Sequence, residues 1–230
     1  MKTENILLFP TLVTLGKREV DELEKESWFS AYLEQSDKDG NSNEFTGHQS
    51  VHHDIRFKRV FSDIADTIRK HLTTLGVDTN MIEVYIQKSF FNVKKNNGNP
   101  QHNHKESHIS FTYYPYIHES RNQQLVFYQD KDKVGNDIYE EFLDFNVKEW
   151  HNINATNYSL PVVEGNIFVF PSKLAHGVNS ESEIGDSEYF KTIEELKLSR
   201  FCVVGDVVLT RKDTKSYDRL LMPIDNWRKF

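Results

Sequence analysis

The first eighty residues contain two stretches in which apolar positions recur at helical spacing. One spans residues 18–35 (REVDELEKESWFSAYLEQ) and predicts an amphipathic helix. The other lies in FKRVFSDIADTIRKHLTTLG, where Gly76 ends both the apolar stripe and the predicted helix. The stripe consists of Phe57, Val60, Phe61, Ile64, Ile68 and Leu72. Before both helices, residues 6–15 (ILLFPTLVTL) are predicted to form a strand, which Pro10 confines to a sheet edge.

After Gly76 the apolar spacing becomes that of β-strands. Short runs rich in Val, Ile, Phe, Tyr and Thr alternate with loops rich in Asn, Gly and Asp. The runs are MIEVYIQKSFFNVKK, HISFTYYPYI, QQLVFYQD, YSLPVVEGNIFVFPS and SRFCVVGDVVLTR. Helices followed by many strands predict an α+β protein in which helices buttress one sheet of a barrel or jelly roll. We expect a single domain over residues 1–230, with the strand and helices in 1–80, the jelly-roll core in 81–210 and a C-terminal extension in 211–230.

Composition excludes several classes of function. The formal net charge of −7 argues against sequence-independent binding to nucleic acid, which requires a basic surface. The single cysteine, Cys202, rules out a disulfide within the chain and a cysteine-based zinc site. No stretch approaches the roughly 18 apolar residues that a membrane span needs, and the N-terminus lacks the features of a signal peptide. We therefore expect a cytoplasmic protein without membrane partners, and a homodimer is compatible with the sequence.

Histidines are concentrated in PQHNHKESHISFTYY, residues 100–114. His102 and His104 are two positions apart, so on an extended segment both point to one side, roughly 6.6 Å apart. An isolated pair of this kind is more often part of a polar loop. A third histidine, His176, follows an apolar strand in EGNIFVFPSKLAHGVNS, and from a barrel rim it could reach the pair. The two elements together predict a metal site formed by three histidines, with His108 as a neighbour that would need a turn to join it.

Arg200 begins an apolar run, RFCVVGDVVLTR. A guanidinium at the start of such an apolar strand needs an anionic partner, and its planar fork of N–H donors suits a carboxylate. That partner is either a nearby acid, such as Glu194 or Glu195, or an anionic ligand.

The chain resembles the jelly-roll core of the 2-oxoglutarate/Fe(II)-dependent oxygenases in the segment HNHKESHISFTYY and in Gly165, Pro171, His176 and Arg200. It is most similar to a small branch, often encoded by phages or marine bacteria, with an HxH…H metal pattern. The resemblance covers about residues 90–208. It implies a double-stranded β-helix (cupin-like) fold and a dioxygenase that uses Fe(II), 2-oxoglutarate and O2. The reaction it implies is hydroxylation of a C–H bond in a peptide or small-molecule substrate, which the sequence does not identify.

The resemblance also implies roles for individual residues. His102 and His176 match the two histidine ligands, and His104 takes the place of the carboxylate in the usual His-x-Asp/Glu…His set. Arg200 matches the arginine that binds the distal carboxylate of 2-oxoglutarate. Further positions that line the co-substrate pocket are matched by Asn92, Ser110 and Tyr113.

Three features depart from the pattern of the superfamily. An all-histidine site carries one negative charge fewer than the usual ligand set. Arg200 follows His176 by 24 residues rather than about ten, so the acidic segment 181–197 is interpreted as an insertion, a loop or short helix near the mouth. Cys202 stands where many relatives have serine. Each departure is compatible with a different substrate or with loss of activity.

Three other functions fit parts of the pattern. The order Gly165, Pro171, His176, Asn179 is close to a cupin motif, which favours a three-histidine metalloenzyme that does not use 2-oxoglutarate. A zinc hydrase fits the ligands alone, but the fold pattern gives it little support. The third is a non-catalytic jelly-roll binding protein with a degenerate site. A cupin-like enzyme does not need Arg200, and a non-catalytic protein need not bind a metal, so these two features distinguish the alternatives.

The remaining histidines receive no ligand role. His52, His53 and Asp54 read literally as H-x-D, but no strand precedes them, and Asp54 is better explained as an N-cap or first-turn acid. His71 lies in a predicted helix, and His151 is interpreted as structural or as part of a substrate loop.

Overall fold

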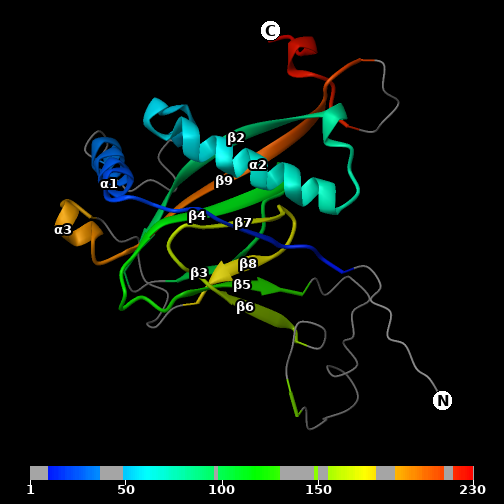
Figure 1. Ribbon diagram of the computed structural model, residues 1–230. Coiled ribbons are helices and arrows are strands. Elements are labelled where there is room, and N and C mark those ends of the chain that lie inside the picture. Colours follow the sequence, from blue (N-terminus) through cyan, green and yellow to red (C-terminus); the bar gives the residue numbers. More distant parts are fainter. Residues whose placement is uncertain are drawn as a thin grey trace.

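Two antiparallel sheets pack face to face, and two long helices cover the outer face of the larger sheet (Figure 1). The computed structural model describes residues 10–36, 49–95, 98–129, 148–149, 155–179, 190–214 and 220–229. The larger sheet contains, in spatial order, β1 (Thr14–Lys17), β7 (Asn166–Pro171), β4 (Ile109–Ile117), β9 (Arg200–Arg211) and β2 (Ile82–Lys94). The smaller sheet contains β3 (Asn99–His102), β8 (His176–Val178), β5 (Gln124–Tyr128) and β6 (Asn157–Pro161). The predicted α+β class with a jelly-roll core is confirmed.

The predicted apolar runs all contain strands. The run YSLPVVEGNIFVFPS contains two of them, β6 and β7, because the chain turns at Gly165, whose φ of 82° favours glycine. A Cβ atom at this position would lie 2.1 Å from the carbonyl oxygen of Arg18, so the turn also needs glycine for space. The edge position expected for the first strand is found in β1, although the strand covers Thr14–Lys17. Of the predicted range 6–15, residues 6–9 lie outside the described part of the chain.

The helical elements are α1 (Glu22–Ser36), α2 (Lys58–Thr74), α3 (Ile193–Leu196), η1 (Val51–His53), η2 (Ile55–Phe57), η3 (Thr79–Met81) and η4 (Ile224–Asn226). Every residue of the predicted stripe on the second helix is buried, and the chain leaves α2 through Gly76, whose φ is 79°. The first helix begins four residues later than predicted. Arg18 is still bound to the sheet through its N–H and the carbonyl oxygen of Gly165, and Asp21 accepts a hydrogen bond from the N–H of Glu24 at the helix start. No helix among the described residues is long and apolar enough to cross a membrane.

The larger sheet has a different core on each face. Between it and the helices lies an aromatic cluster in which the rings of Trp28 and Phe57 stack at 3.4 Å. Between the two sheets lies a smaller cluster that includes Tyr114, Phe168 and Phe170. Both faces of β4 are therefore buried over most of its length. Successive residues of β4 point alternately toward the helices and toward the space between the sheets.

Part of the acidic segment 181–197 lies in the described residues. It contains α3, whose Leu196 is buried in the cluster on the helix side of the sheet. Residues 180–189 lie outside the described part. At the other end of β9, Thr210 forms a β-bridge with Leu221, so the residues near the C-terminus fold back along the sheet.

Candidate metal centre

Three histidines meet where β3 and β8 run side by side. His102 ends β3 and is paired in register with His176, which begins β8. His104 lies two residues beyond, where its N–H donates to the carbonyl oxygen of Ser172 (2.8 Å). One ligand-capable nitrogen from each ring lies within 4.8 Å of the other two. Among the described residues this is the one such group of three histidine, cysteine or acidic side chains.

Hydrogen bonds select the same tautomer in all three rings. The contacts join His102 Nδ1 to the Pro100 carbonyl oxygen (2.8 Å), His104 Nδ1 to Asp206 Oδ2 (2.8 Å) and His176 Nδ1 to the Leu174 carbonyl oxygen (2.9 Å). Carbonyl and carboxylate oxygens accept and do not donate, so each Nδ1 carries the hydrogen. The lone pair of each neutral ring is then on Nε2, the form in which an imidazole binds a metal.

His176 is held neutral. Its side chain is 5% exposed, and burial is the main reason that its pKa is lowered to about 4. The hydrogen bond to the Leu174 carbonyl opposes this shift, and the positive charges that His102 and His104 can carry add to it. At neutral pH the ring therefore offers a lone pair without first losing a proton.

A buried carboxylate binds the Nδ1 side of the His104 ring. Asp206 on β9 is 1% exposed, and its Oδ2 contacts His104 Nδ1 and accepts from Lys88 Nζ (2.9 Å), while its Oδ1 accepts from the hydroxyl of Ser110 (2.6 Å). Burial alone would raise the pKa of Asp206, but the hydrogen bonds from these three side chains outweigh it and lower the pKa to about 2. Asp206 is therefore ionised at neutral pH.

Sequence reasoning missed Asp206. Its signal was present, because Asp206 is the one acidic residue in the otherwise apolar or small run FCVVGDVVL. A charge at such a position needs a partner of the kind that His104 and Lys88 provide.

A cavity of about 450 Å³ opens beside the histidines and is lined by residues of both sheets. The three histidines line it together with Arg200, and its apolar walls include Leu125 and Phe170. Its volume is in the range of small-molecule sites.

Arg200 is buried in this cavity and has no carboxylate partner among the described residues. It is 1% exposed, one of its terminal nitrogens donates to Asn92 Oδ1 (3.2 Å), and its guanidinium lies 5.8 Å from the centre of the Tyr114 ring. Its Nε has no hydrogen-bond partner in the part of the chain that the structure describes. Neither of the nearby acids forms an ion pair with it, since Glu195 instead accepts hydrogen bonds in the capping box of α3. Among the described residues no acid therefore pairs with Arg200, and its Nε is available to an anionic ligand.

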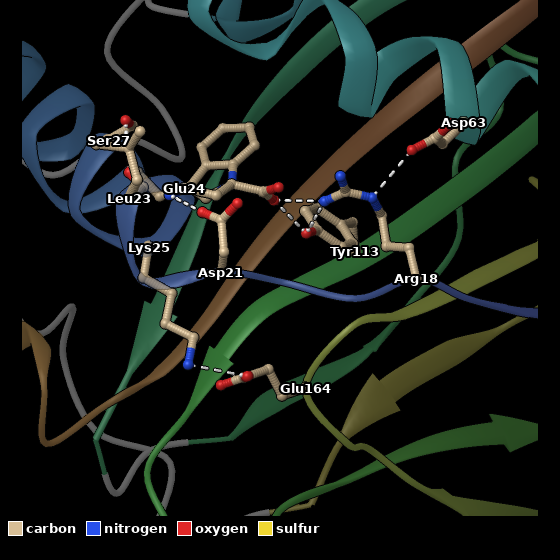
Figure 2. Close-up of polar contacts among 10 residues, drawn as sticks. Arg18, Asp21, Leu23, Glu24, Lys25, Ser27, Asp63, Tyr113 and Glu164 are labelled. Atoms are coloured by element: carbon tan, nitrogen blue, oxygen red, sulfur yellow. Dashed lines mark hydrogen bonds and ion pairs between the residues drawn. The ribbon is translucent and has the colours of Figure 1, made fainter.

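Two of the three further positions expected along the co-substrate pocket, Asn92 and Ser110, do line the cavity, but Tyr113 does not. The Tyr113 hydroxyl donates to Glu24 (2.6 Å) and accepts from Arg18 (2.7 Å) on the helix side of the sheet, as Figure 2 shows. The expectation for Tyr113 was wrong by one residue, because neighbouring residues of a strand face opposite sides. Tyr114 is the tyrosine that lines the cavity.

The other histidines lie elsewhere. Asp54 accepts from the N–H of Arg56 and caps η2, which confirms its predicted capping role. The ring nitrogen partners are the Ser89 hydroxyl for His52, the Thr14 hydroxyl for His71 and the Leu209 N–H for His108. His151 lies outside the described residues.

Residues 90–186 match a family model described as "Putative 2OG-Fe(II) oxygenase". The crystal structure of the non-heme alpha ketoglutarate dependent carbocyclase SnoK from nogalamycin biosynthesis is similar at 12% identity and a TM-score of 0.51, over 87% of this chain and 82% of that one. HygX from Streptomyces hygroscopicus with iron bound is similar at 13% identity and a TM-score of 0.48, over 86% and 82% of the two chains.

An oxidoreductase of the 2OG-Fe(II) oxygenase family from Burkholderia pseudomallei matches at 12% identity and a TM-score of 0.36. The match covers 68% of this chain and 54% of that one, so the chain spans about half the length of this relative. No curated protein matches. The likeness to SnoK shows a double-stranded β-helix fold. The family match contains all three clustered histidines, so residues 90–186 are similar to the 2-oxoglutarate- and Fe(II)-dependent oxygenases over the segment that forms the candidate metal centre.

Proposed function

We propose that this protein is a dioxygenase in which His102, His104 and His176 hold Fe(II), and in which Arg200 binds the far carboxylate of 2-oxoglutarate. The co-substrate, iron and O2 together supply the oxidising chemistry when bound. We further propose that the reaction hydroxylates a C–H bond of a peptide or small molecule. The net charge of −7 favours a neutral or basic substrate over nucleic acid.

The histidine cluster fits a divalent metal. Three neutral imidazoles with Nε2 free and Nδ1 bound elsewhere can occupy one face of an ion, which leaves positions for a chelating co-substrate. Iron is compatible with imidazole ligands, and the family match selects it over zinc.

The observation that carries the proposal is the buried guanidinium of Arg200, which has no carboxylate partner among the described residues. Burying a charge without a partner of opposite charge is unfavourable by several kcal/mol, so a buried guanidinium of this kind indicates a site where an anionic ligand binds. A carboxylate can accept two parallel hydrogen bonds from the fork of Arg200, including one from the free Nε. A three-histidine metalloenzyme that does not use 2-oxoglutarate has no need of this residue.

Other cavity residues orient Arg200 and keep water out. Asn92 accepts a hydrogen bond from its guanidinium, and the Tyr114 ring lies against it, so the fork is directed before a ligand arrives. Leu125 and Phe170 contribute apolar wall to the same cavity, which strengthens the interaction of Arg200 with an anion.

The proposal is tested by anaerobic calorimetry of the Fe(II)-loaded protein with two ligands. The first is 2-oxoglutarate, and the second is 2-oxopentanoate, which keeps the keto acid and lacks the far carboxylate. We expect metal-dependent 1:1 binding of 2-oxoglutarate by the wild type. Arg200→Met should bind 2-oxoglutarate about as weakly as the wild type binds 2-oxopentanoate, because each change removes one partner of the same contact.

Equal binding of the two ligands by the wild type would refute the assignment of Arg200. Iron binding without any binding of 2-oxoglutarate would favour the cupin-like alternative. Absence of iron binding would favour a non-catalytic protein.

A further inference from the structure

The three-histidine cluster contains no anionic ligand, yet a buried anion contacts it. Because imidazole ligands are neutral, none of the three ligands would offset the two positive charges of a divalent ion. The Oδ2 atom of Asp206 lies 2.8 Å from His104 Nδ1, on the side of the ring opposite Nε2. Glu106 also lines the cavity, but it is exposed to solvent.

We propose that Asp206 is the positioning residue of the metal centre and supplies, through His104, the negative charge that the ligand set lacks. The inference rests on the proposed function, since it assigns a role toward the same metal. Asp206 would hold the His104 ring in one orientation, keep the hydrogen on Nδ1 and make Nε2 more basic toward the metal.

Asp206 is fixed by its neighbours on rigid strands. In the register of the larger sheet it is paired with Lys88 of β2 on one side and with Ser110 of β4 on the other, and both side chains donate to its carboxylate. The Ser110 hydroxyl also contacts that of Ser172 (3.0 Å). Since the Ser172 carbonyl oxygen binds the His104 N–H, the same network holds both the backbone and the ring of His104.

The competing interpretation is that Asp206 serves only as the ion-pair partner of Lys88. Lys88 has a side chain that is 29% exposed, so water can reach its ammonium group. For His104 Nδ1, Asp206 is the one acceptor among the described residues. A structural ion pair would leave the properties of a bound metal unchanged when its charges are removed.

Two isosteric or nearly isosteric changes separate these interpretations. Asp206→Asn keeps the shape and one acceptor for His104 but removes the charge. Fe(III) carries one charge more than Fe(II), so loss of a nearby anion should raise the Fe(III)/Fe(II) midpoint potential. Lys88→Met removes the cation that partly neutralises Asp206, so it should shift the potential in the opposite direction. Asp206→Ala removes charge and acceptor together and should weaken Fe(II) binding by roughly 10–100-fold, the usual effect of losing such an outer partner.

The test measures anaerobic Fe(II) affinity and midpoint potential for the wild type, Asp206→Asn, Asp206→Ala and Lys88→Met, with the melting temperature of each apoprotein as a check of folding. Opposite shifts of the potential, upward for Asp206→Asn and downward for Lys88→Met, would support the inference. A folded Asp206→Asn protein with the affinity and potential of the wild type would overturn it. If Asp206→Asn fails to fold, Lys88→Met decides: a lowered potential supports the inference and an unchanged potential overturns it. Absence of Fe(II) binding by the wild type would instead refute the proposed function, and this inference with it.

Discussion

Acidification should destabilise the metal-free protein through His176. The unfolded chain takes up a proton at this residue below its ordinary pKa of 6.5, whereas the buried ring of the folded protein stays neutral down to about pH 4. The unfolded state therefore binds more protons than the folded state between these values. It follows that the free energy of unfolding falls as the pH falls from 6.5 to 4.

The size of the effect follows from the shift of the pKa of His176. A shift from 6.5 to about 4 corresponds to about 3 kcal/mol when complete, and to about 2.5 kcal/mol at pH 4.5. The matched variant is His176→Asn, whose side-chain nitrogen can still donate to the Leu174 carbonyl oxygen and does not titrate. Other histidines titrate in both proteins, so their contributions cancel in the difference.

Urea denaturation at pH 7 and pH 4.5, with a chelator present, measures this difference. Fluorescence is a suitable signal, because Trp28 is fully buried in the helix-side core. We expect the wild type to lose about 2.5 kcal/mol more than His176→Asn between the two pH values. Equal losses in the two proteins would refute the reasoning, since the folded state would then accept a proton on His176 as readily as the unfolded chain does.

Three further predictions concern the scaffold and the metal. Tyr113→Phe removes the hydroxyl that binds Glu24 and Arg18, so chemical denaturation should show a loss of about 1–3 kcal/mol while calorimetry shows unchanged 2-oxoglutarate affinity. A weakened affinity for 2-oxoglutarate would contradict this and indicate that Tyr113 contacts the co-substrate. Gly165→Ala should lower the melting temperature, because its φ of 82° costs about 1–3 kcal/mol for a residue with a side chain and its Cβ would clash with the Arg18 carbonyl oxygen; an unchanged melting temperature would contradict this. Mn(II) at 100 times its dissociation constant should stabilise the wild type by about 2.7 kcal/mol and leave His102→Ala unchanged in a thermal shift assay, and equal stabilisation of both would remove His102 from the metal site.

The sequence predicted the elements of this fold better than the faces of its strands. Apolar runs are sufficient to locate β4 and β7, because buried strands are rich in Val, Ile, Phe and Tyr whatever surrounds them. The sequence did not show which face of the sheet each residue of β4 points to, because both faces of this strand are buried. No alternation of polar and apolar residues marks Tyr113 as facing the helices and Tyr114 as facing the cavity. The start of α1 was placed too early because helical spacing begins in sequence at residue 18, while the backbone of Arg18 is held by a residue of a distant turn.

The candidate site could be predicted where its chemistry is carried by residue type. Three histidines and a buried arginine are unusual enough to be singled out, and the structure brings all four to one cavity. Asp206 could not be placed in the same way, because its partner His104 lies 102 positions earlier in the chain and the contact depends on the pairing of strands. An acidic residue within an apolar strand is nevertheless a signal that a buried partner exists.

The most direct test of the central claim is an anaerobic titration of the Fe(II)-loaded protein with 2-oxoglutarate, followed by visible absorption. Chelation of iron by the keto acid should produce the weak charge-transfer band of this enzyme class, saturating at one equivalent. Arg200→Met should bind iron equally well and require far more 2-oxoglutarate to produce the same band. Full iron occupancy without a band, or an identical titration of Arg200→Met and wild type, would contradict the account.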